Sequence, residues 1–383
     1  MSSRHPTVAE IDLGAFCHNL DLVHRSIPPG VKVAAMVKAD GYGHGALPLS
    51  RAALQAGLAE IFGVAHVDEA VELREAGLEA PIIVLGGFFE DRVEEVVAYG
   101  LELALYSMKH AEALASEARR QARIVACHLK LDTGMGRLGL PPERALEEAK
   151  RLSDLKGVKL AGIMTHFATA DHADKAYTSE QLARFERAVR SVRDAGFEVP
   201  CVHAANSAAI LSLPESHYDM VRPGIMLYGA PPSAEVGADA DLRPVMTLKT
   251  RVGHLFDLAV GESVSYGRRY VADRPSRIAT LPIGYADGWS RLLSNRGSAL
   301  VGGWRVPIVG TVCMDLTMVD VTEVPGVSVG DEVVLIGRQG DALITADEVA
   351  AASETISYEV FTRIGKRVPR LYVQDGRPLE VVP

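Results

Sequence analysis

The stretch VKVAAMVKADGYGHG, residues 31–45, combines an apolar run with a lysine and a glycine-rich turn. The run over residues 31–37 has the composition of a buried strand, and Lys38 stands where that strand ends. A lysine at a strand end is commonly a solvated surface residue. Here the apolar approach favours burial, which disfavours the charged amine, and the glycines allow a tight turn around a ligand. Lys38 is therefore a candidate nucleophilic amine.

Further apolar runs follow, and most are rich in Val, Ile and Leu without alternation, as in parallel strands covered on both faces. The predicted strands are Lys32–Val37, Ile61–Ala65, Ile82–Leu85, Leu103–Tyr106, Ile124–Leu131, Lys159–Thr165, Glu198–His203 and Tyr218–Val221. Helical patterns separate them, and Thr178 with Gln181 predicts a capping box at the start of one helix. Eight βα units predict a closed (β/α)8 TIM-type barrel, with a doubly wound open sheet as the alternative.

Beyond residue 242 the pattern changes. Strand-like runs such as RIATLPIGYADG and GDEVVLIG are separated by Gly and Pro turns, and a helical pattern returns only at Thr345–Ser353. This sequence pattern is typical of a mostly β domain. We therefore expect a barrel domain over residues 1–242 and a mostly β C-terminal domain over residues 243–383.

Composition narrows the functional classes. The 383 residues carry 40 basic and 49 acidic side chains, a net charge of −9, which disfavours nucleic acid and anionic membranes as partners. No apolar run is long enough to span a bilayer, and no signal peptide is recognisable. The four cysteines form no CxxC pair and are typical of reduced thiols in a cytoplasmic protein. Cys127-His128 and Cys201-Val-His203 lack a second pair at zinc spacing, so we expect no metal site.

In a parallel barrel the functional side chains gather at the carboxyl ends of the strands. The strand ends here supply Lys130, Asp132, Arg137, His166, Asn206, Ser207, Arg222, Gly224 and Ile225. The loops after strands seven and eight often bind phosphate through helix N-terminal amides. A phosphate-bearing ligand opposite a lysine suggests pyridoxal 5'-phosphate held as a Schiff base.

The motif MVKADGYGHG resembles the cofactor-attachment motif of alanine racemases. Further motifs that resemble this family follow in family order: HLKLDTGMGRLG, THFATAD, HAANSAA, MVRPGIMLYG, SYGRRY, GYADGWSR, GTVCMDLTMVDV, TISYEV and RVPR. They extend from about Glu10 to Arg370. One departure is Leu316, where the family usually has glutamine.

The resemblance implies interconversion of L- and D-alanine by two bases, Lys38 for the D enantiomer and Tyr266 for the L enantiomer. It also implies a hydrogen-bonded line from Tyr266 through His166 to Arg222, which would face the pyridine nitrogen and leave it unprotonated. The expected cofactor-binding residues are Lys38, Tyr42, His166, Asn206, Ser207, Arg222, Gly224, Ile225 and Tyr358. The expected substrate-binding residues are Arg137, Met314 and Tyr285.

The resemblance further implies a carbamate on Lys130 that holds Arg137, with a plain Lys130–Asp132 ion pair as the alternative. It implies a homodimer with shared active sites, as opposed to a monomer, and a role in supplying D-alanine for peptidoglycan. The rival functions are racemisation of serine, lysine or several amino acids, a pyridoxal-phosphate carrier, and an amino-acid decarboxylase. The SYG tyrosine, Tyr266, disfavours the last two.

Overall fold

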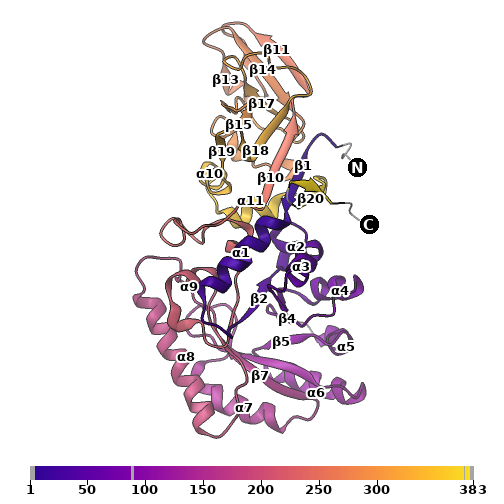
Figure 1. Ribbon diagram of the computed structural model, residues 1–383, viewed down its shortest axis with the longest axis vertical. Helices are drawn as coiled ribbons and strands as arrows, with labels where there is room; N and C mark the ends of the chain where they lie inside the picture. The colour runs from indigo at the N-terminus through magenta and orange to yellow at the C-terminus, as the bar shows by residue number, and fades with distance from the viewer. Residues whose placement is uncertain (1–4, 88–89, 375, 380–383) are drawn as a thin grey trace. The chain divides into compact units, whose positions relative to one another are not determined.

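The computed structural model describes residues 5–87, 90–374 and 376–379. The chain divides into two compact units. The barrel unit comprises Cys17–Gly41 and Ala46–Leu242, and the β unit comprises the residues up to Phe16, Tyr42–Gly45 and the residues from Arg243 onward. Figure 1 shows the parallel strands and flanking helices of the first and the sheets of the second.

The barrel unit contains eight strands that pair in parallel in the order β8-β7-β6-β5-β4-β3-β2-β9. Their bounds are β2 Lys32–Met36, β3 Ile61–Val64, β4 Ile82–Val84, β5 Glu102–Leu105, β6 Val125–Lys130, β7 Val158–Met164, β8 Val202–His203 and β9 Met220–Val221. Backbone hydrogen bonds from Asp219 to Val202 (3.1 Å) and from Arg222 to Ala205 (2.9 Å) join the two ends of this order. The barrel is therefore closed, and the open-sheet alternative is excluded.

Helices alternate with the strands, as right-handed βαβ connections require. They are α1 Leu13–Ser26, α2 Lys38–Tyr42, α3 Ala46–Gln55, α4 Val67–Glu75, α5 Val93–Ala98, α6 Met108–Arg120, α7 Ala145–Asp154, α8 Ala176–Asp194 and α9 Ser207–Ser212. Short 3-10 turns lie at η1 Glu90–Arg92, η2 Pro142–Arg144, η3 Pro214–Ser216 and η4 Ile225–Tyr228. The longer helices bury one apolar stripe. In α6 this stripe includes Ala111, Leu114 and Ala118.

The predicted capping box at Thr178 is wrong. Helix α8 begins earlier, at Ala176, whose amide donates to the Asp174 carboxylate across 2.9 Å. Thr178 is buried inside the helix. The side chain of Gln181 bonds instead to the loop after β7, where its oxygen accepts from the Ala168 amide across 2.9 Å. Gln181 and Thr178 thus form hydrogen bonds with the loop after β7, and not the helix cap that the local sequence pattern predicts.

The β unit contains a large sheet in the order β16-β15-β18-β10-β1-β20-β21, with β19 paired to β18, and two smaller sheets. The large sheet comprises β1 Val8–Asp12, β10 Met246–Arg251, β15 Ser298–Val301, β16 Trp304–Pro307, β18 Glu332–Gln339, β19 Ala342–Ile344, β20 Arg370–Gln374 and β21 Arg377–Pro378. The smaller sheets comprise β11 His254–Leu258, β14 Ser276–Leu281 and β17 Thr317–Asp320, and β12 Ser263–Val264 with β13 Tyr270–Val271.

Two helices, α10 Ala346–Ala352 and α11 Ser357–Arg363, and the turns η5 Tyr266–Arg268, η6 Tyr285–Asp287 and η7 Arg291–Leu293 complete this unit. The expectation of a mostly β second domain is confirmed. The compact units do not divide at residue 242 alone, because β1 pairs antiparallel with β10 and parallel with β20. The N-terminal strand therefore belongs to the β unit.

The segment Tyr42–Gly45 also belongs to the β unit. The Arg370 side chain donates to the carbonyl of Gly43 across 3.0 Å. Gly43 has φ +81, and a β-carbon there would lie 2.5 Å from the carbonyl oxygen of Phe361. Glycine thus allows the backbone to approach α11 closely. No helix among the described residues combines the length and apolarity needed to cross a membrane.

Candidate active site

Lys38 follows β2 and opens a turn of unusual backbone conformation. Ala39 (φ 52, ψ 48), Asp40 (φ 51, ψ 53) and Gly41 (φ 60, ψ 45) are all left-handed, which costs each non-glycine residue roughly 1 kcal/mol. Two carboxylates hold the turn. Glu69 accepts from the Ala39 amide across 2.6 Å, and Asp40 accepts from the Ala46 amide across 2.8 Å. The strain is therefore placed directly beside the candidate nucleophile.

The Lys38 amine lies among positive charges. Burial lowers its pKa, the charge of Arg137 lowers it further, and Glu69 opposes both. The pKa of Lys130 is lowered to about 8 by burial and by the charges of Arg222, Arg137 and Lys38. The Lys130 Nζ donates to the carbonyl of Leu85 across 3.2 Å. Lys38, Arg137 and Arg222 therefore all lie close enough to Lys130 for their charges to lower its pKa.

The turn between Lys130 and Arg137 is organised by Asp132. Its Oδ1 accepts from the amides of Gly134 (2.9 Å) and Gly136 (3.0 Å). Burial alone would raise the pKa of Asp132, but these backbone hydrogen bonds lower it overall. Arg137, at the end of this turn, is exposed.

The loops after β8 and β9 meet at Ser207. Its Oγ accepts from the Gly224 amide across 2.8 Å and from the Met226 amide across 3.4 Å. Asn206 caps α9 by accepting from the Ala209 amide across 3.0 Å. The structure thus brings Ser207 and Gly224 into contact, next to the half-buried Asn206 and the buried Ile225 in the chain.

Arg222 is 3% exposed and is held on several sides. Its Nη1 donates to His203 Nδ1 across 2.8 Å, and its Nη2 donates to the carbonyls of Thr165 (2.7 Å) and Ala204 (3.1 Å). Burial lowers its pKa to about 10. Within the described part of the chain, no hydrogen bond joins Arg222 to His166, so the imidazole that contacts Arg222 is that of His203.

His166, after β7, is half-buried. Burial and the charges of Arg222, Arg137, Lys130 and Lys38 hold its pKa well below the usual range, so the imidazole is neutral near pH 7. His203 and its neighbour His128 were not predicted as site residues. The signal in the sequence that points to them is the pair of motifs Cys127-His128 and Cys201-Val-His203, whose spacing does not suit a metal site.

In the β unit, Tyr266 is 72% exposed at the start of η5. The Thr311 hydroxyl donates to its carbonyl across 2.8 Å. The Ser265 hydroxyl donates to the Thr311 carbonyl across 2.6 Å and lies 3.3 Å from Cys313 Sγ. This local network connects the tyrosine to the loop that carries Met314.

Tyr285 and Met314 lie on neighbouring segments of the same unit. The Tyr285 amide donates to the Cys313 carbonyl across 3.0 Å, and the Ala286 amide donates to the Met314 carbonyl across 2.9 Å. A β-carbon at Gly284 would lie 2.3 Å from both of these carbonyl oxygens, so only glycine fits there. The side chains of Tyr285, Met314 and Leu316 are all exposed.

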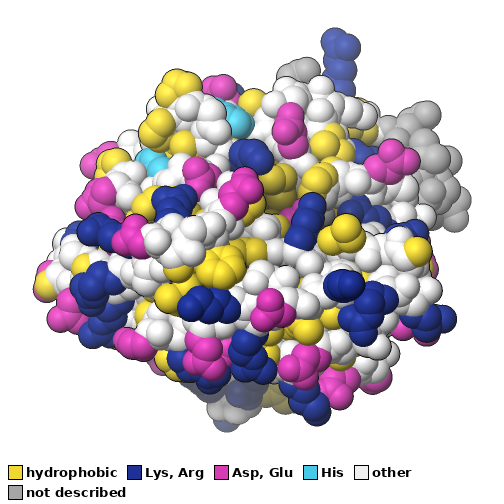
Figure 2. Space-filling model, turned by 90° about the horizontal axis from the view of Figure 1, so that it is seen from below, with side chains coloured by type: hydrophobic (Ala, Val, Ile, Leu, Met, Phe, Trp, Pro, Cys, Tyr) yellow, Lys and Arg dark blue, Asp and Glu magenta, His cyan; other side chains and the backbone are white. Residues whose placement is uncertain are grey.

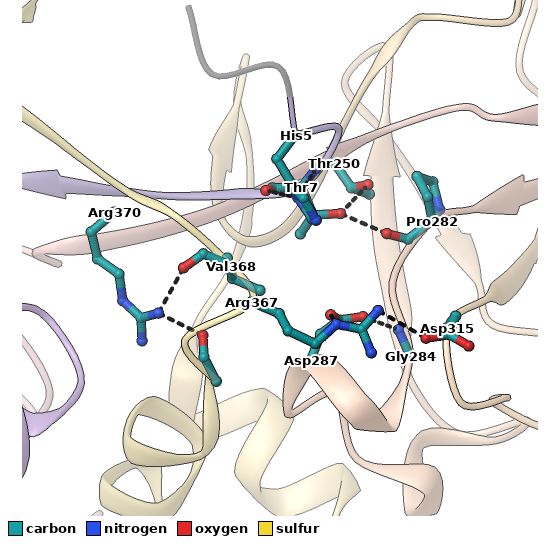
Figure 3. A network of polar contacts seen from close by, with 11 residues as sticks. His5, Thr7, Thr250, Pro282, Gly284, Asp287, Asp315, Arg367, Val368 and Arg370 are labelled. Atoms are coloured by element: carbon teal, nitrogen blue, oxygen red, sulfur yellow. Dashed lines mark hydrogen bonds and ion pairs between the residues drawn. The ribbon is translucent and has the colours of Figure 1, made fainter.

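Arg367 joins the two segments. Figure 3 shows its guanidinium between Asp287, at 3.2 Å, and Asp315, at 2.8 Å. Asp287 in turn accepts from the Gly284 amide across 2.9 Å. The RVPR motif therefore positions the turns that bear Tyr285 and Met314. Also in this unit, the rings of Tyr42 and Tyr358 lie 6.1 Å apart and tilted by 47°.

The chain is similar to known proteins over most of its length. The chain matches the family model "Alanine racemase, N-terminal domain" over residues 11–232 and "Alanine racemase, C-terminal domain" over residues 245–372. It is 45% identical to an alanine racemase of Halothermothrix orenii over 96% of this chain and 97% of the relative. It is 47% identical to one of Symbiobacterium thermophilum over 97% of this chain and 98% of the relative.

The chain is also similar to solved structures. The chain superposes on an alanine racemase of Clostridium difficile 630 with a TM-score of 0.94 at 35% identity, covering 99% of this chain and 98% of the other. It superposes on one from Bacillus anthracis with bound L-Ala-P with a TM-score of 0.92 at 36% identity, again covering 99% and 98%. The chain therefore belongs to the alanine racemase family of isomerases.

Proposed function

We propose that this chain interconverts L- and D-alanine with pyridoxal 5'-phosphate as cofactor. The observation that carries the proposal is the gathering of Lys38, Lys130, Arg137 and Arg222 in the barrel unit, where burial and neighbouring positive charges lower the pKa of both lysines. Such a cluster suits an anionic ligand. A phosphate-bearing aldehyde fits this donor set, because a buried amine of lowered pKa can attack a carbonyl carbon.

The assignments of cofactor contacts follow from the same residues. Lys38 would hold the cofactor covalently, and Arg222 would face its ring nitrogen. Ser207, Gly224 and Ile225 would bind its phosphate, supported by Asn206 at the start of α9 and by Tyr42 and Tyr358. His166 would act beside Arg222 as a neutral imidazole. When bound, the cofactor supplies the electron sink that makes the α-proton of an amino acid removable.

Two side chains would move the proton. Inversion requires a base on one face of the α-carbon and an acid on the other. We assign these roles to the Lys38 Nζ for D-alanine and to the Tyr266 phenol oxygen for L-alanine. Arg137 and the Met314 backbone would bind the substrate carboxylate, and Tyr285 would narrow the entrance so that a small side chain is favoured.

The proposal includes a homodimer with shared active sites. Its support is the exposure of Tyr266, Tyr285, Met314 and Leu316 on the β unit, because large apolar side chains in solvent are typical of a surface that another chain covers. A two-fold pairing would form two equal sites. The alternative is a monomer in which each chain supplies both bases.

We further propose that the enzyme acts in the cytoplasm and supplies D-alanine for peptidoglycan. All four cysteines are free thiols, which suits a reducing compartment. Nucleic acid is not proposed as a partner. Figure 2 shows a face on which basic and acidic side chains intermingle, unlike the one-sign surface that nucleic acid requires.

The test is a racemisation assay. Purified full-length chain with pyridoxal phosphate is incubated with L-alanine, and circular dichroism follows the loss of optical activity. The proposal predicts approach to a racemic mixture and no activity in Lys38→Ala. A panel with serine and lysine distinguishes the rival racemases. Faster turnover of either amino acid than of alanine, or no racemisation of alanine, contradicts the proposal.

A further inference from the structure

A continuous chain of hydrogen bonds runs through the barrel unit from Arg222 to Glu102. Arg222 Nη1 lies 2.8 Å from His203 Nδ1, and His203 Nε2 lies 2.9 Å from His128 Nδ1. His128 Nε2 lies 3.0 Å from Glu102 Oε2. Arg222, His203 and His128 are each at most 3% exposed, whereas the Glu102 side chain is 29% exposed. We call these four residues the Arg222–Glu102 chain.

The two ends of this chain dictate the tautomers of its histidines. Arginine has donors only, so His203 Nδ1 must accept. A neutral His203 then carries its proton on Nε2 and donates to His128 Nδ1. His128 therefore carries its proton on Nε2 and donates to the Glu102 carboxylate, which only accepts when ionised. Burial and the charge of Arg222 hold the pKa of His203 well below its usual range, so a neutral His203 is consistent with its surroundings.

A glycine in β7 and a register shift between β6 and β7 lie beside the Arg222–Glu102 chain. A β-carbon at Gly162 in β7 would lie 2.6 Å from His128 Nδ1 and 2.4 Å from the carbonyl oxygen of Cys201. The pairing of β6 with β7 also shifts its register between Cys127 and His128. The conformation of Gly162 does not itself require glycine, because its φ lies outside the positive range. The limited space between the His128 imidazole and the Cys201 carbonyl is what requires it.

Arg222 has more N–H donors than hydrogen bonds to the described residues. Its side chain has five N–H groups, and its hydrogen bonds within the described residues go to His203, Thr165 and Ala204. The position of the guanidinium therefore depends on the acceptor that His203 provides. Glu102, at the opposite end of the chain, contributes a charge that also acts on Arg74, whose pKa it raises against the effect of burial.

We propose that Glu102 and His128 are positioning residues for Arg222. The Glu102 carboxylate fixes the tautomer of His128, and His128 fixes the tautomer of His203, whose Nδ1 then accepts from Arg222. The two residues thereby hold the guanidinium with its remaining N–H donors available to the ring of the cofactor. The proposal rests on the proposed function, because it takes that ring as the ligand of Arg222. It adds two residues that act from the amino-terminal half of β5 and from within β6, away from the strand ends that carry the site.

The test compares Glu102→Gln with Glu102→Leu. Glutamine retains an acceptor for His128 Nε2, whereas leucine has a similar size and no acceptor. Since Glu102 is partly exposed, both variants should fold, which thermal unfolding checks. Long-range proton–nitrogen NMR of the full-length chain with 15N-labelled histidine and pyridoxal phosphate distinguishes protonated from bare ring nitrogens. His128→Asn and His203→Asn identify the signals.

In the unmodified chain both histidines should be protonated on Nε2 and bare on Nδ1. Glu102→Leu should shift the His203 signals, although Glu102 is linked to His203 through His128. It should also lower kcat for racemisation about tenfold. Glu102→Gln should leave the His203 signals in place and kcat within about twofold. His128→Leu leaves no acceptor toward His203 at residue 128. It should reproduce the effects of Glu102→Leu even if that variant fails to fold.

Protonation of His128 or His203 on Nδ1 in the unmodified protein overturns the proposal. So do His203 signals and a kcat in Glu102→Leu that match those of Glu102→Gln. These results are separate from a failure of the proposed function. If the chain does not racemise alanine, that function fails, while the NMR signals of His203 still decide whether Glu102 acts on it.

Discussion

The Glu69 carboxylate accepts a hydrogen bond of 2.6 Å from the amide of Ala39, the residue that follows Lys38. The same carboxylate accepts from the amides of Ala65 (2.6 Å) and His66 (3.0 Å). One side chain of α4 therefore holds both the left-handed turn after β2 and the start of its own helix. The position of Lys38 depends on a residue that has no place in the proposed chemistry.

Replacing Glu69 by alanine should lower the free energy of unfolding by about 1–3 kcal/mol, because hydrogen bonds to an ionised group are lost and this carboxylate is partly exposed. Urea unfolding measures the change. Racemisation should also slow, since the turn beside Lys38 relaxes. Glu72→Ala, an exposed glutamate on the same helix, is the control and should change the stability by less than about 0.5 kcal/mol. Equal effects of the two substitutions would contradict this role.

Lys130 should take up carbon dioxide in a pH-dependent way. Only a neutral amine attacks carbon dioxide, and the pKa of Lys130 is lowered to about 8. The carbamate should therefore increase as the pH rises through about 8 and decrease below it. Carbon NMR with 13C-bicarbonate measures the carbamate, and Lys130→Gln should abolish the signal. A signal that persists in this variant, or that ignores pH, refutes the assignment.

The same shift has a consequence for stability. An unmodified Lys130 binds fewer protons in the folded state than in the unfolded state between pH about 8 and about 10.5. Its contribution to stability should therefore rise with pH across that window. Lys130→Met should remove this part of the pH dependence, as measured by thermal unfolding at several pH values.

Tyr266→Phe should slow α-proton removal from L-alanine by about 100-fold or more, because it removes one proton-transfer group. Removal from D-alanine should be affected less, since Lys38 serves that face. Single-turnover exchange of the α-proton in deuterated water measures each enantiomer. Tyr270→Phe, in the same SYGRRY motif, is the control and should leave the ratio unchanged. Equal losses for both enantiomers would count against two separate bases.

Shared active sites predict complementation between two inactive variants. Lys38→Ala and Tyr266→Ala are mixed under conditions that exchange subunits. If each site takes its lysine from one chain and its tyrosine from the other, a mixed dimer contains one intact site, and activity reappears. If each chain supplies both residues, activity stays absent. Inactivity after exchange has been demonstrated by mass would exclude the shared arrangement.

The barrel could be predicted from the sequence because its signals are local. All eight apolar runs became strands, and Lys38 lies at the end of the first as expected. The place of β1 could not be predicted. VAEID is short, and its partners β10 and β20 lie far away in the sequence. Strand β8 is only Val202–His203, shorter than its apolar composition suggested.

The positions of some candidate site residues were predictable as well. Ser207 and Gly224 lie together because loops after adjacent barrel strands must meet. The Arg222–Glu102 chain was not predictable, because Glu102, His128, His203 and Arg222 come from four different strands or strand ends. Each residue alone reads as an ordinary polar position. Only the closed barrel shows that their side chains form a single line of hydrogen bonds.

Trapping the cofactor on the chain tests the proposed role of Lys38 most directly. Full-length protein that racemises L-alanine is reduced with borohydride, which fixes the pyridoxyl group on the lysine that holds it. Digestion and mass spectrometry then locate the label. One pyridoxyl group per chain is expected, on Lys38, in the peptide that contains VKADGYGHG. A label on Lys130 or another lysine, or an active chain with no label, would contradict it.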